Sequence, residues 1–224
     1  MSGQLDTLPW GEDPLDSSIT VSMLSDSLDR AGLRSQVLAS RLQPLVPLTR
    51  ATGRARTALF VPDDTVDPER PYDDAIDFID GSQPGDFIVV STSESNASAF
   101  WGELFSAAAH GRHAAGMLTD GNVRDSDKIV ALRFPVFAAS RRPIDFRGRM
   151  KIESQQTTVH IGGVAIEPGD LIAADDDGIV VIPHASEREV IEFARERARA
   201  ESTVLAELLA GATLRDVWTR HGIL

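Results

Sequence analysis

The chain has 224 residues, which is long enough to bury a substantial core and within the range of a single domain. Hydrophobic residues make up 42% of it and charged residues 25%, as in an ordinary globular protein. The net charge of −12 argues against a nucleic-acid groove, because affinity there depends on clustered Lys and Arg.

Three further absences narrow the classes of protein. The sequence has no cysteine, which excludes disulfides, thiolate nucleophiles and zinc–thiolate sites. No apolar run reaches the roughly 20 residues that a membrane-spanning helix needs, so no membrane partner is expected. The N-terminus lacks a basic region followed by an apolar stretch, so we expect no secretory signal and a cytoplasmic location.

The first third of the chain mixes helices and strands. Residues 1–17 are rich in Pro, Gly, Asp and Ser and are predicted to form an N-terminal arm, with one domain over 18–224. Ser22 to Gly32 has a helical apolar face and a glycine stop. Thr57 to Val61 reads as a strand, and Asp73 to Asp80 as a short helix.

The central stretch, from Trp101 to Lys128, combines elements with polar groups. Five apolar residues fall at helical spacing and predict a helix with one buried stripe that ends at Gly111: Phe100, Trp101, Leu104, Phe105 and Ala108. Residues 87–90 and 116–119 are short and apolar, like buried strands, and Asp120-Gly121-Asn122 is typical of a turn.

Charged side chains follow that predicted turn directly. Arg124 and Asp125 come where a strand delivers its end to solvent, and ligands bind at such strand ends in α/β proteins. If the helix begins near Gly102, its free N–H groups form a carboxylate site beside Glu103. The pattern therefore predicts a pocket in which a helix start, a guanidinium and two carboxylates converge.

The remainder is β-rich and then helical. Strands are predicted at 136–138, 157–161, 164–166, 171–174 and 179–182, with hairpin turns at Gly162-Gly163 and Asp177-Gly178. Helices follow from about residue 185, where Ser186 and Glu189 have the spacing of a capping box, and a last helix spans 214–220. This order lacks the even β-α alternation of a Rossmann or barrel fold, so the pattern alone indicates α/β or α+β.

The central motifs resemble the signature of the RraA-like family. The matching elements are Gly102-Glu103-Leu104, a gap of twenty residues and Asp120-Gly121-Asn122-Val123-Arg124-Asp125. The family contains class II aldolases for 4-hydroxy-4-methyl-2-oxoglutarate and 4-carboxy-4-hydroxy-2-oxoadipate, and the RraA regulators of ribonuclease E. The resemblance implies an α/β protein with the layered β/β/α fold that is related to swivelling phosphohistidine domains.

The resemblance also implies roles for individual residues. Asp125 is expected to bind a divalent metal, Mg2+ or Mn2+, and Arg124 to stabilise an enolate oxygen. Glu103 corresponds to an acid that contacts metal-bound water, and the backbone near Gly102, Leu104 and Phe105 to the group that holds the substrate carboxylate. The ordinary alternatives are a structural Arg124–Asp125 ion pair and a Glu103 that only stabilises the helix dipole.

Two points of the family pattern stay open in this sequence. The family usually carries an acid three positions after the Arg-Asp pair, where this chain has Lys128, and the adjacent Asp127 is the alternative donor. A third acid reaches the family's site from the C-terminal segment of a neighbouring subunit in a homotrimer or hexamer. Glu201 is nearest to that position, with Glu196 and Glu207 in the same region.

These expectations amount to a metal-dependent lyase that cleaves a 4-hydroxy-2-oxo acid to pyruvate by retro-aldol chemistry, with oxaloacetate decarboxylation as a second activity. The alternatives are a non-catalytic regulator that binds a ribonuclease, and a relative acting on another 2-oxo or sugar acid. Arg141 and Arg142 follow a predicted strand and are either surface residues or a second anion contact.

Overall fold

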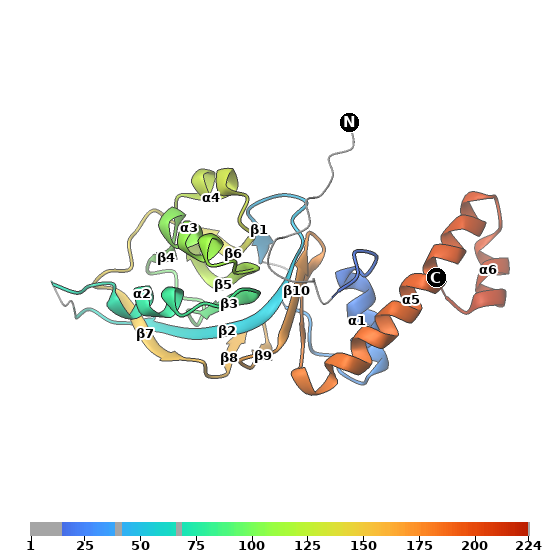
Figure 1. The fold of residues 1–224 in the computed structure, drawn as a ribbon, viewed down its shortest axis with the longest axis horizontal. Coiled ribbons are helices and arrows are strands. Elements are labelled where there is room, and N and C mark those ends of the chain that lie inside the picture. The colour runs from blue at the N-terminus through green and yellow to red at the C-terminus, as the bar shows by residue number, and fades with distance from the viewer. Residues whose placement is uncertain (1–14, 39–41, 66–68, 224) are drawn as a thin grey trace.

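The computed structural model describes residues 15–38, 42–65 and 69–223 (Figure 1). Its helices are α1 (Val21–Arg30), α2 (Asp73–Asp80), α3 (Glu103–Gly111), α4 (Ser126–Leu132), α5 (Glu187–Leu209) and α6 (Leu214–His221), with a 3-10 turn at His184–Ser186. Its strands are β1 (Gln43–Pro44), β2 (Ala51–Pro62), β3 (Asp86–Ser91), β4 (Ala99–Trp101), β5 (Gly116–Val123), β6 (Val136–Arg141), β7 (Met150–Gln155), β8 (Val159–Ile161), β9 (Val164–Ile166), β10 (Leu171–Asp175) and β11 (Gly178–Ile182).

One large mixed sheet forms the centre of the described chain. Its order is β1-β6-β5-β3-β2-β10-β11, with β4 added beside β5 and β7 beside β2. The strands β2, β3, β5 and β6 run parallel, and β4 is parallel to β5. Because the ends of parallel strands meet at one edge, the residues that follow β4, β5 and β6 are brought close together.

Helices cover two separate parts of this sheet. Figure 1 shows α2, α3 and α4 gathered over the parallel strands, whereas α1 and α5 lie beyond β10 at the other end of the molecule. The first group shares an aromatic core that includes Phe60, Phe78, Trp101 and Phe134. The second group buries Leu24, Leu28 and Val190 against β10 and β11. The hairpin β8–β9 packs through a third apolar cluster on the sheet.

Most predicted elements are present, some with different bounds. The helices predicted at 22–32, 73–80 and 214–220 appear as α1, α2 and α6, and α3 ends at the predicted Gly111. Both predicted hairpins form. β8–β9 turns at Gly162-Gly163 as predicted, and β10–β11 turns at Asp176-Asp177, one residue before the predicted Asp177-Gly178. The first 14 residues of the predicted N-terminal arm lie outside the described residues.

The predicted buried stripe of the central helix was wrong. Phe100 and Trp101 belong to β4, and the helix begins only after Gly102. The side chain of Leu104 is 79% exposed, and the buried positions of α3 are Ser106 and Ala109. A buried strand is followed almost directly by a helix here, so apolar residues of the strand and of the helix together imitated the spacing of one longer helix.

The turn predicted at Asp120-Gly121-Asn122 was also wrong, because β5 continues through it to Val123. In a turn these polar side chains would hydrogen-bond to water, whereas in β5 they hydrogen-bond to buried groups of the protein. The Asp120 carboxylate accepts hydrogen bonds from the amides of Thr92 (2.6 Å) and Glu94 (3.1 Å) and from the hydroxyls of Ser91 and Thr92. A polar group that is fully paired can stay inside a strand.

Other local differences have similar tertiary causes. Ser186 caps nothing with its side chain, so the predicted capping box is absent. The neighbouring Glu187 instead pairs with Arg54 of β2. Strand β7 and helix α4 were not predicted, because the polar residues of each, such as Lys151 and Asp127, obscure the apolar pattern. Among the described residues, no helix is both long enough and apolar enough to cross a membrane.

The buried Asp120 carboxylate generates a stability prediction. Changing Asp120→Ala removes the acceptor for four donors inside the protein, and buried donors without partners are costly. We expect a loss of about 3 kcal/mol or more in the free energy of unfolding, measured by urea denaturation. Asp77→Ala, on the exposed side of α2, is the control and should change stability by less than about 1 kcal/mol.

The ion pair between Arg54 and Glu187 generates a pH prediction. Hydrogen bonding from Arg54 is the main reason that the pKa of Glu187 lies below its ordinary value of 4.5. A lowered folded-state pKa stabilises the protein above pH 4.5, and that stabilisation is lost as the pH falls through the folded-state pKa. The Glu187→Gln variant should therefore be less stable than wild type at pH 7, with a difference that shrinks below pH 4.5.

Thermal melts of both proteins between pH 3 and pH 8 would measure this difference. Glu189→Gln is the matched control, because Glu189 is exposed and lies two residues after Glu187 in the first turn of α5. A constant difference between Glu187→Gln and wild type across the whole pH range would contradict the assignment.

Candidate active site

The helix start in this site is held by a buried indole. Trp101 is fully buried, and its Nε1 donates a 2.7 Å hydrogen bond to Ser106 Oγ in the second turn of α3. Gly102 is the N-cap, and the first helical hydrogen bond runs from the Ser106 amide to the Gly102 carbonyl. The amides of Glu103, Leu104 and Phe105 precede that bond and so have no acceptor within the helix. The Glu103 amide donates to Asp125 instead, which leaves the amides of Leu104 and Phe105 as the free donors of this helix start.

The end of β5 lies directly against that helix start. The Arg124 amide donates to the Trp101 carbonyl at 2.9 Å, which extends the pairing of β5 with β4 by one residue. Asp125 then has a left-handed backbone with φ of 54° and starts α4. Its Oδ2 accepts a 3.4 Å hydrogen bond from the Glu103 amide. The two segments that the sequence separates by twenty residues are thus in contact.

The guanidinium of Arg124 lies between two carboxylates. Its Nε is 3.7 Å from Asp125 Oδ2, and its Nη1 is 3.5 Å from Asp145 Oδ1. The hydroxyl of Tyr72 donates a short hydrogen bond to the other Asp145 oxygen, and this bond raises the pKa of Tyr72. The side chain of Arg124 is 37% exposed, so it keeps a solvent-facing part between these partners.

A cavity of about 280 Å³ opens at this strand end. Its lining includes Arg124, Asp125, Ser126, Arg141 and Arg142. The register of β6 pairs Arg141 with Val123, and the Arg142 amide donates to the Val123 carbonyl at 2.9 Å, so both arginines flank the end of β5. Three guanidinium groups and one carboxylate around one cavity favour an anionic ligand.

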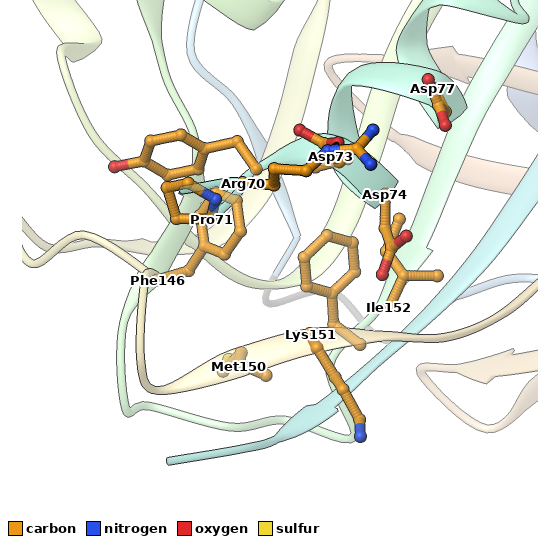
Figure 2. A pocket seen from close by; sticks show the side chains of 12 residues that line it. Arg70, Pro71, Asp73, Asp74, Asp77, Phe146, Met150, Lys151 and Ile152 are labelled. Carbon is orange, nitrogen blue, oxygen red and sulfur yellow. Dashed lines mark ion pairs between the residues drawn. The ribbon is translucent and has the colours of Figure 1, made fainter. Parts of the chain in front are cut away.

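A larger cavity of about 350 Å³ lies between α2 and β7 (Figure 2). Figure 2 shows Phe146, Met150 and Ile152 beside it, with Asp74 and Asp77 on the helix above. None of the predicted site residues lines this cavity, and its acids have no predicted chemical role. We therefore place the candidate active site at the smaller cavity, where the polar groups converge.

The predicted site residues do not all meet. Gly102, Glu103, Arg124 and Asp125 are brought together, and the free amides of Leu104 and Phe105 belong to the same helix start. Phe105 itself packs on the Trp101 ring, with ring centroids 5.8 Å apart. Neither Lys128 nor Asp127 lines the cavity, and both are exposed on α4.

The C-terminal acids lie elsewhere in the single chain. Glu201 pairs with Arg197 at 2.6 Å within α5, Glu196 with Arg30 at 3.0 Å, and Glu207 with His221 at 3.0 Å. Figure 1 shows α5 and α6 projecting away from α3 and α4. A role for Glu201 in this site thus requires a second subunit, and that role stays a prediction.

Sequence reasoning missed Tyr72 and Asp145. Tyr72 is the only tyrosine of the chain and directly precedes α2, but nothing in its local sequence points to Arg124. Asp145 has one signal that could have found it, because it is the only acid in the basic segment from Arg141 to Lys151. A lone carboxylate among cations is a natural partner for one of them.

The donor groups fit a weakly held hard cation and not a closed metal cage. Among the described residues, no group of three or more His, Asp or Glu side chains could hold a metal. Asp125 offers one carboxylate that is 46% exposed at the cavity. Mg2+ commonly uses one or two protein carboxylates and takes its other ligands from water and substrate, which a single Asp125 can satisfy.

The fold and site together define a layered α/β protein with a charged pocket at the ends of parallel strands. A family model described as RraA-like, Aldolase/RraA, matches residues 21–181. This chain belongs to the RraA-like family, and its architecture is the RraA-like fold.

Individual relatives have different names. The protein DlpA of Legionella pneumophila is 28% identical over 193 residues, which are 86% of this chain and 31% of DlpA, so the chain spans less than a third of that relative. A Halalkalibacterium halodurans protein named "Putative 4-hydroxy-4-methyl-2-oxoglutarate aldolase" is 31% identical over 180 residues, 80% of each chain.

Solved structures agree with the family assignment. The crystal structure of Streptomyces coelicolor RraAS2, described as an unusual member of the RNase ES inhibitor RraA protein family, is 26% identical to this chain. The two superpose with a TM-score of 0.73, covering 86% of this chain and 98% of that chain.

The close packing at Gly102 generates a test of the site geometry. A Cβ at this position would lie 2.7 Å from Asp125 Oδ2 and 3.1 Å from Arg124 Cγ. Both are side-chain atoms that can move, so Gly102→Ala should displace these groups while changing stability by less than about 1 kcal/mol. A crystal structure of the variant would show whether the bond between the Glu103 amide and Asp125 is lost.

Gly111→Ala in the same helix is the matched control, because a Cβ there meets no atom within 4 Å. It should leave the site unchanged and stabilise the helix slightly, since alanine has the higher helix propensity. An unchanged Asp125 position in Gly102→Ala would contradict the close packing of Gly102 against Asp125 and Arg124.

Proposed function

We propose that this chain is a divalent-metal-dependent lyase that cleaves a 4-hydroxy-2-oxo acid to pyruvate by retro-aldol chemistry. The observation that carries the proposal is the contact between the start of α3 and the end of β5, which brings the α3 amides and Glu103 next to Arg124 and Asp125, and these last two residues line the cavity. The relative named as an aldolase, 31% identical over 80% of each chain, supports the same class of reaction.

Each group of the site suits one part of a 2-oxo acid. The free amides at the start of α3 suit the C1 carboxylate, because a helix N-terminus carries partial positive charge. The guanidinium of Arg124 can donate to the C2 oxygen and stabilise the negative charge that develops there. This charge is the main energetic problem of the reaction, since breaking the C3–C4 bond leaves an enolate.

Asp125 would hold the metal, which we propose to be Mg2+ or Mn2+. A divalent cation supplies Lewis-acid polarisation of the C2 carbonyl when it is bound. The backbone amide of Glu103 donates to the Asp125 carboxylate, and Glu103 is the first residue of α3. From there Glu103 can accept the proton of the C4 hydroxyl through a water molecule.

The assembled protein is proposed to be a homotrimer or hexamer with sites between subunits. The C-terminal helices support this, because Leu205, Leu209, Leu214 and Trp218 expose apolar surface on α5 and α6. In such an assembly Glu201 of a neighbouring chain would be the third acid of the site. Oxaloacetate decarboxylation passes through the same enolate and removes no hydroxyl proton, so it is proposed as a side activity that needs no base.

The reaction can be tested by pyruvate release from 4-hydroxy-4-methyl-2-oxoglutarate and from oxaloacetate, with Mg2+, with Mn2+ and with EDTA. We expect turnover that requires the metal and that falls by about 100-fold or more in Arg124→Ala and in Asp125→Asn, since each removes a group that stabilises the developing charge.

Lys128→Gln is the matched control, because Lys128 is near in sequence but does not line the cavity. It should keep wild-type turnover. Full activity in the Arg124→Ala variant, or full activity in EDTA, would rule out this mechanism. Turnover of oxaloacetate alone would indicate a different 2-oxo acid as the natural substrate.

A regulator of a ribonuclease is the second candidate function. The likeness to RraAS2 favours it, and the exposed apolar residues of α5 and α6 offer a surface for a protein partner. The two candidates separate clearly in the assay above. A folded protein that turns over neither substrate but inhibits an RNase E-type ribonuclease in vitro would support the regulator.

A further inference from the structure

Arg124 is bound on two sides by carboxylates that come from different parts of the fold. Asp125 approaches Nε at 3.7 Å, and Asp145 approaches Nη1 at 3.5 Å. Among the described residues, the other terminal nitrogen, Nη2, donates no hydrogen bond to a protein acceptor. Two opposed anions restrict the rotation of a guanidinium, and they leave the remaining nitrogen for a ligand in the cavity.

Asp145 is itself fixed more firmly than an ordinary loop residue. The Ala99 amide donates to the Ile144 carbonyl at 2.8 Å, and Ala99 and Asp145 form a β-bridge. Arg149 Nη1 donates to the Asp145 carbonyl at 2.9 Å. The backbone of Asp145 is thereby tied to β4, the strand that leads into the helix start of the site.

The two oxygens of the Asp145 carboxylate have different partners, Tyr72 and Arg124. The Tyr72 hydroxyl donates a hydrogen bond to Oδ2, and the Tyr72 ring packs edge-on against Phe146, with 5.4 Å between the ring centroids. Oδ1 is buried and accepts no hydrogen bond from the described residues, and its nearest cation is Arg124. Burying a carboxylate oxygen without a hydrogen bond lowers the stability of a protein. The position of Asp145 Oδ1 beside Arg124 therefore suggests a functional role for this contact.

We propose that Tyr72 and Asp145 are positioning residues that hold the guanidinium of Arg124 in its reactive orientation. This inference rests on the proposed lyase function of the site. Tyr72 fixes the rotation of the Asp145 carboxylate, and Asp145 fixes the guanidinium. An arginine side chain loses much rotational freedom when it is ordered, so ordering it before the substrate binds removes that cost from the reaction.

A purely structural ion pair would have different consequences. Removing it would lower stability and leave the catalytic constants of the folded protein unchanged. A positioning role predicts a selective loss of kcat with little change in KM, because Arg124 acts on charge that develops only in the transition state. Tyr72 should matter only while Asp145 is present.

The first experiment reads the orientation of Arg124 without any substrate. The Nε–Hε signal of Arg124 in a ¹⁵N NMR spectrum of the whole protein can be assigned by its loss in Arg124→Lys. We expect this signal to shift or broaden in Tyr72→Phe and in Asp145→Asn. Asp74→Asn is the matched control, since Asp74 is exposed on α2 next to Tyr72, and it should leave the signal unchanged. An unchanged Arg124 signal in both variants would overturn the inference.

The second experiment measures pyruvate release by the same proteins with Mg2+. We expect kcat to fall about tenfold in Tyr72→Phe and further in Asp145→Asn, with KM changed less than about threefold. In the double variant, Tyr72→Phe should add nothing to the effect of Asp145→Asn, because the two residues act in series. Additive losses, or losses in KM alone, would contradict the positioning role. Absence of turnover in wild type would refute the proposed function, while the NMR result would still decide the positioning of Arg124.

Discussion

The site depends on the burial of a fully paired carboxylate inside β5. Asp120 accepts four hydrogen bonds from the last residue of β3 and the segment that follows it, so the chain does not turn to reach solvent at this polar residue. The strand therefore continues to Val123 and delivers Arg124 and Asp125 beyond the sheet, against the start of α3. The buried Asn122 is paired only in part: its Nδ2 donates to the Ser98 carbonyl at 3.0 Å, and its Oδ1 accepts no hydrogen bond from the described residues.

The charge distribution of the chain fits a small anionic ligand held together with a cation. A net charge of −12 attracts divalent metals to the protein as a whole and repels anions at long range. The cavity at the end of β5 reverses the sign locally, since Arg124, Arg141 and Arg142 line it with only Asp125 as an anion. Screening at physiological salt limits the repulsion to about 8 Å, so the local arginines determine binding within the pocket.

Sequence reasoning found the chemical residues of the site more accurately than the elements that carry them. Gly102 and the Arg124–Asp125 pair stand beside strong local signals, a helix start and a strand end, and the structure brings them into contact. Trp101 and Asp120 were misread because their partners are distant in sequence, and tertiary burial decides whether an aromatic or an acid lies in a strand. Asp145 could not be connected to Arg124 at all, since that pairing depends on the way the loop after β6 returns to β4.

The left-handed backbone at Asp125 restricts the residue types that this position can accept. Its φ of 54° is open to glycine, asparagine and aspartate, and is unfavourable for longer or branched side chains. Of those three residues, only aspartate carries a charge. The geometry of the strand-to-helix junction therefore favours aspartate over glutamate before any ligand is considered, although Glu94 shows that the chain also holds a glutamate at φ of 61°. At position 103, where the backbone is helical, no such restriction applies, and there the chain carries the longer acid.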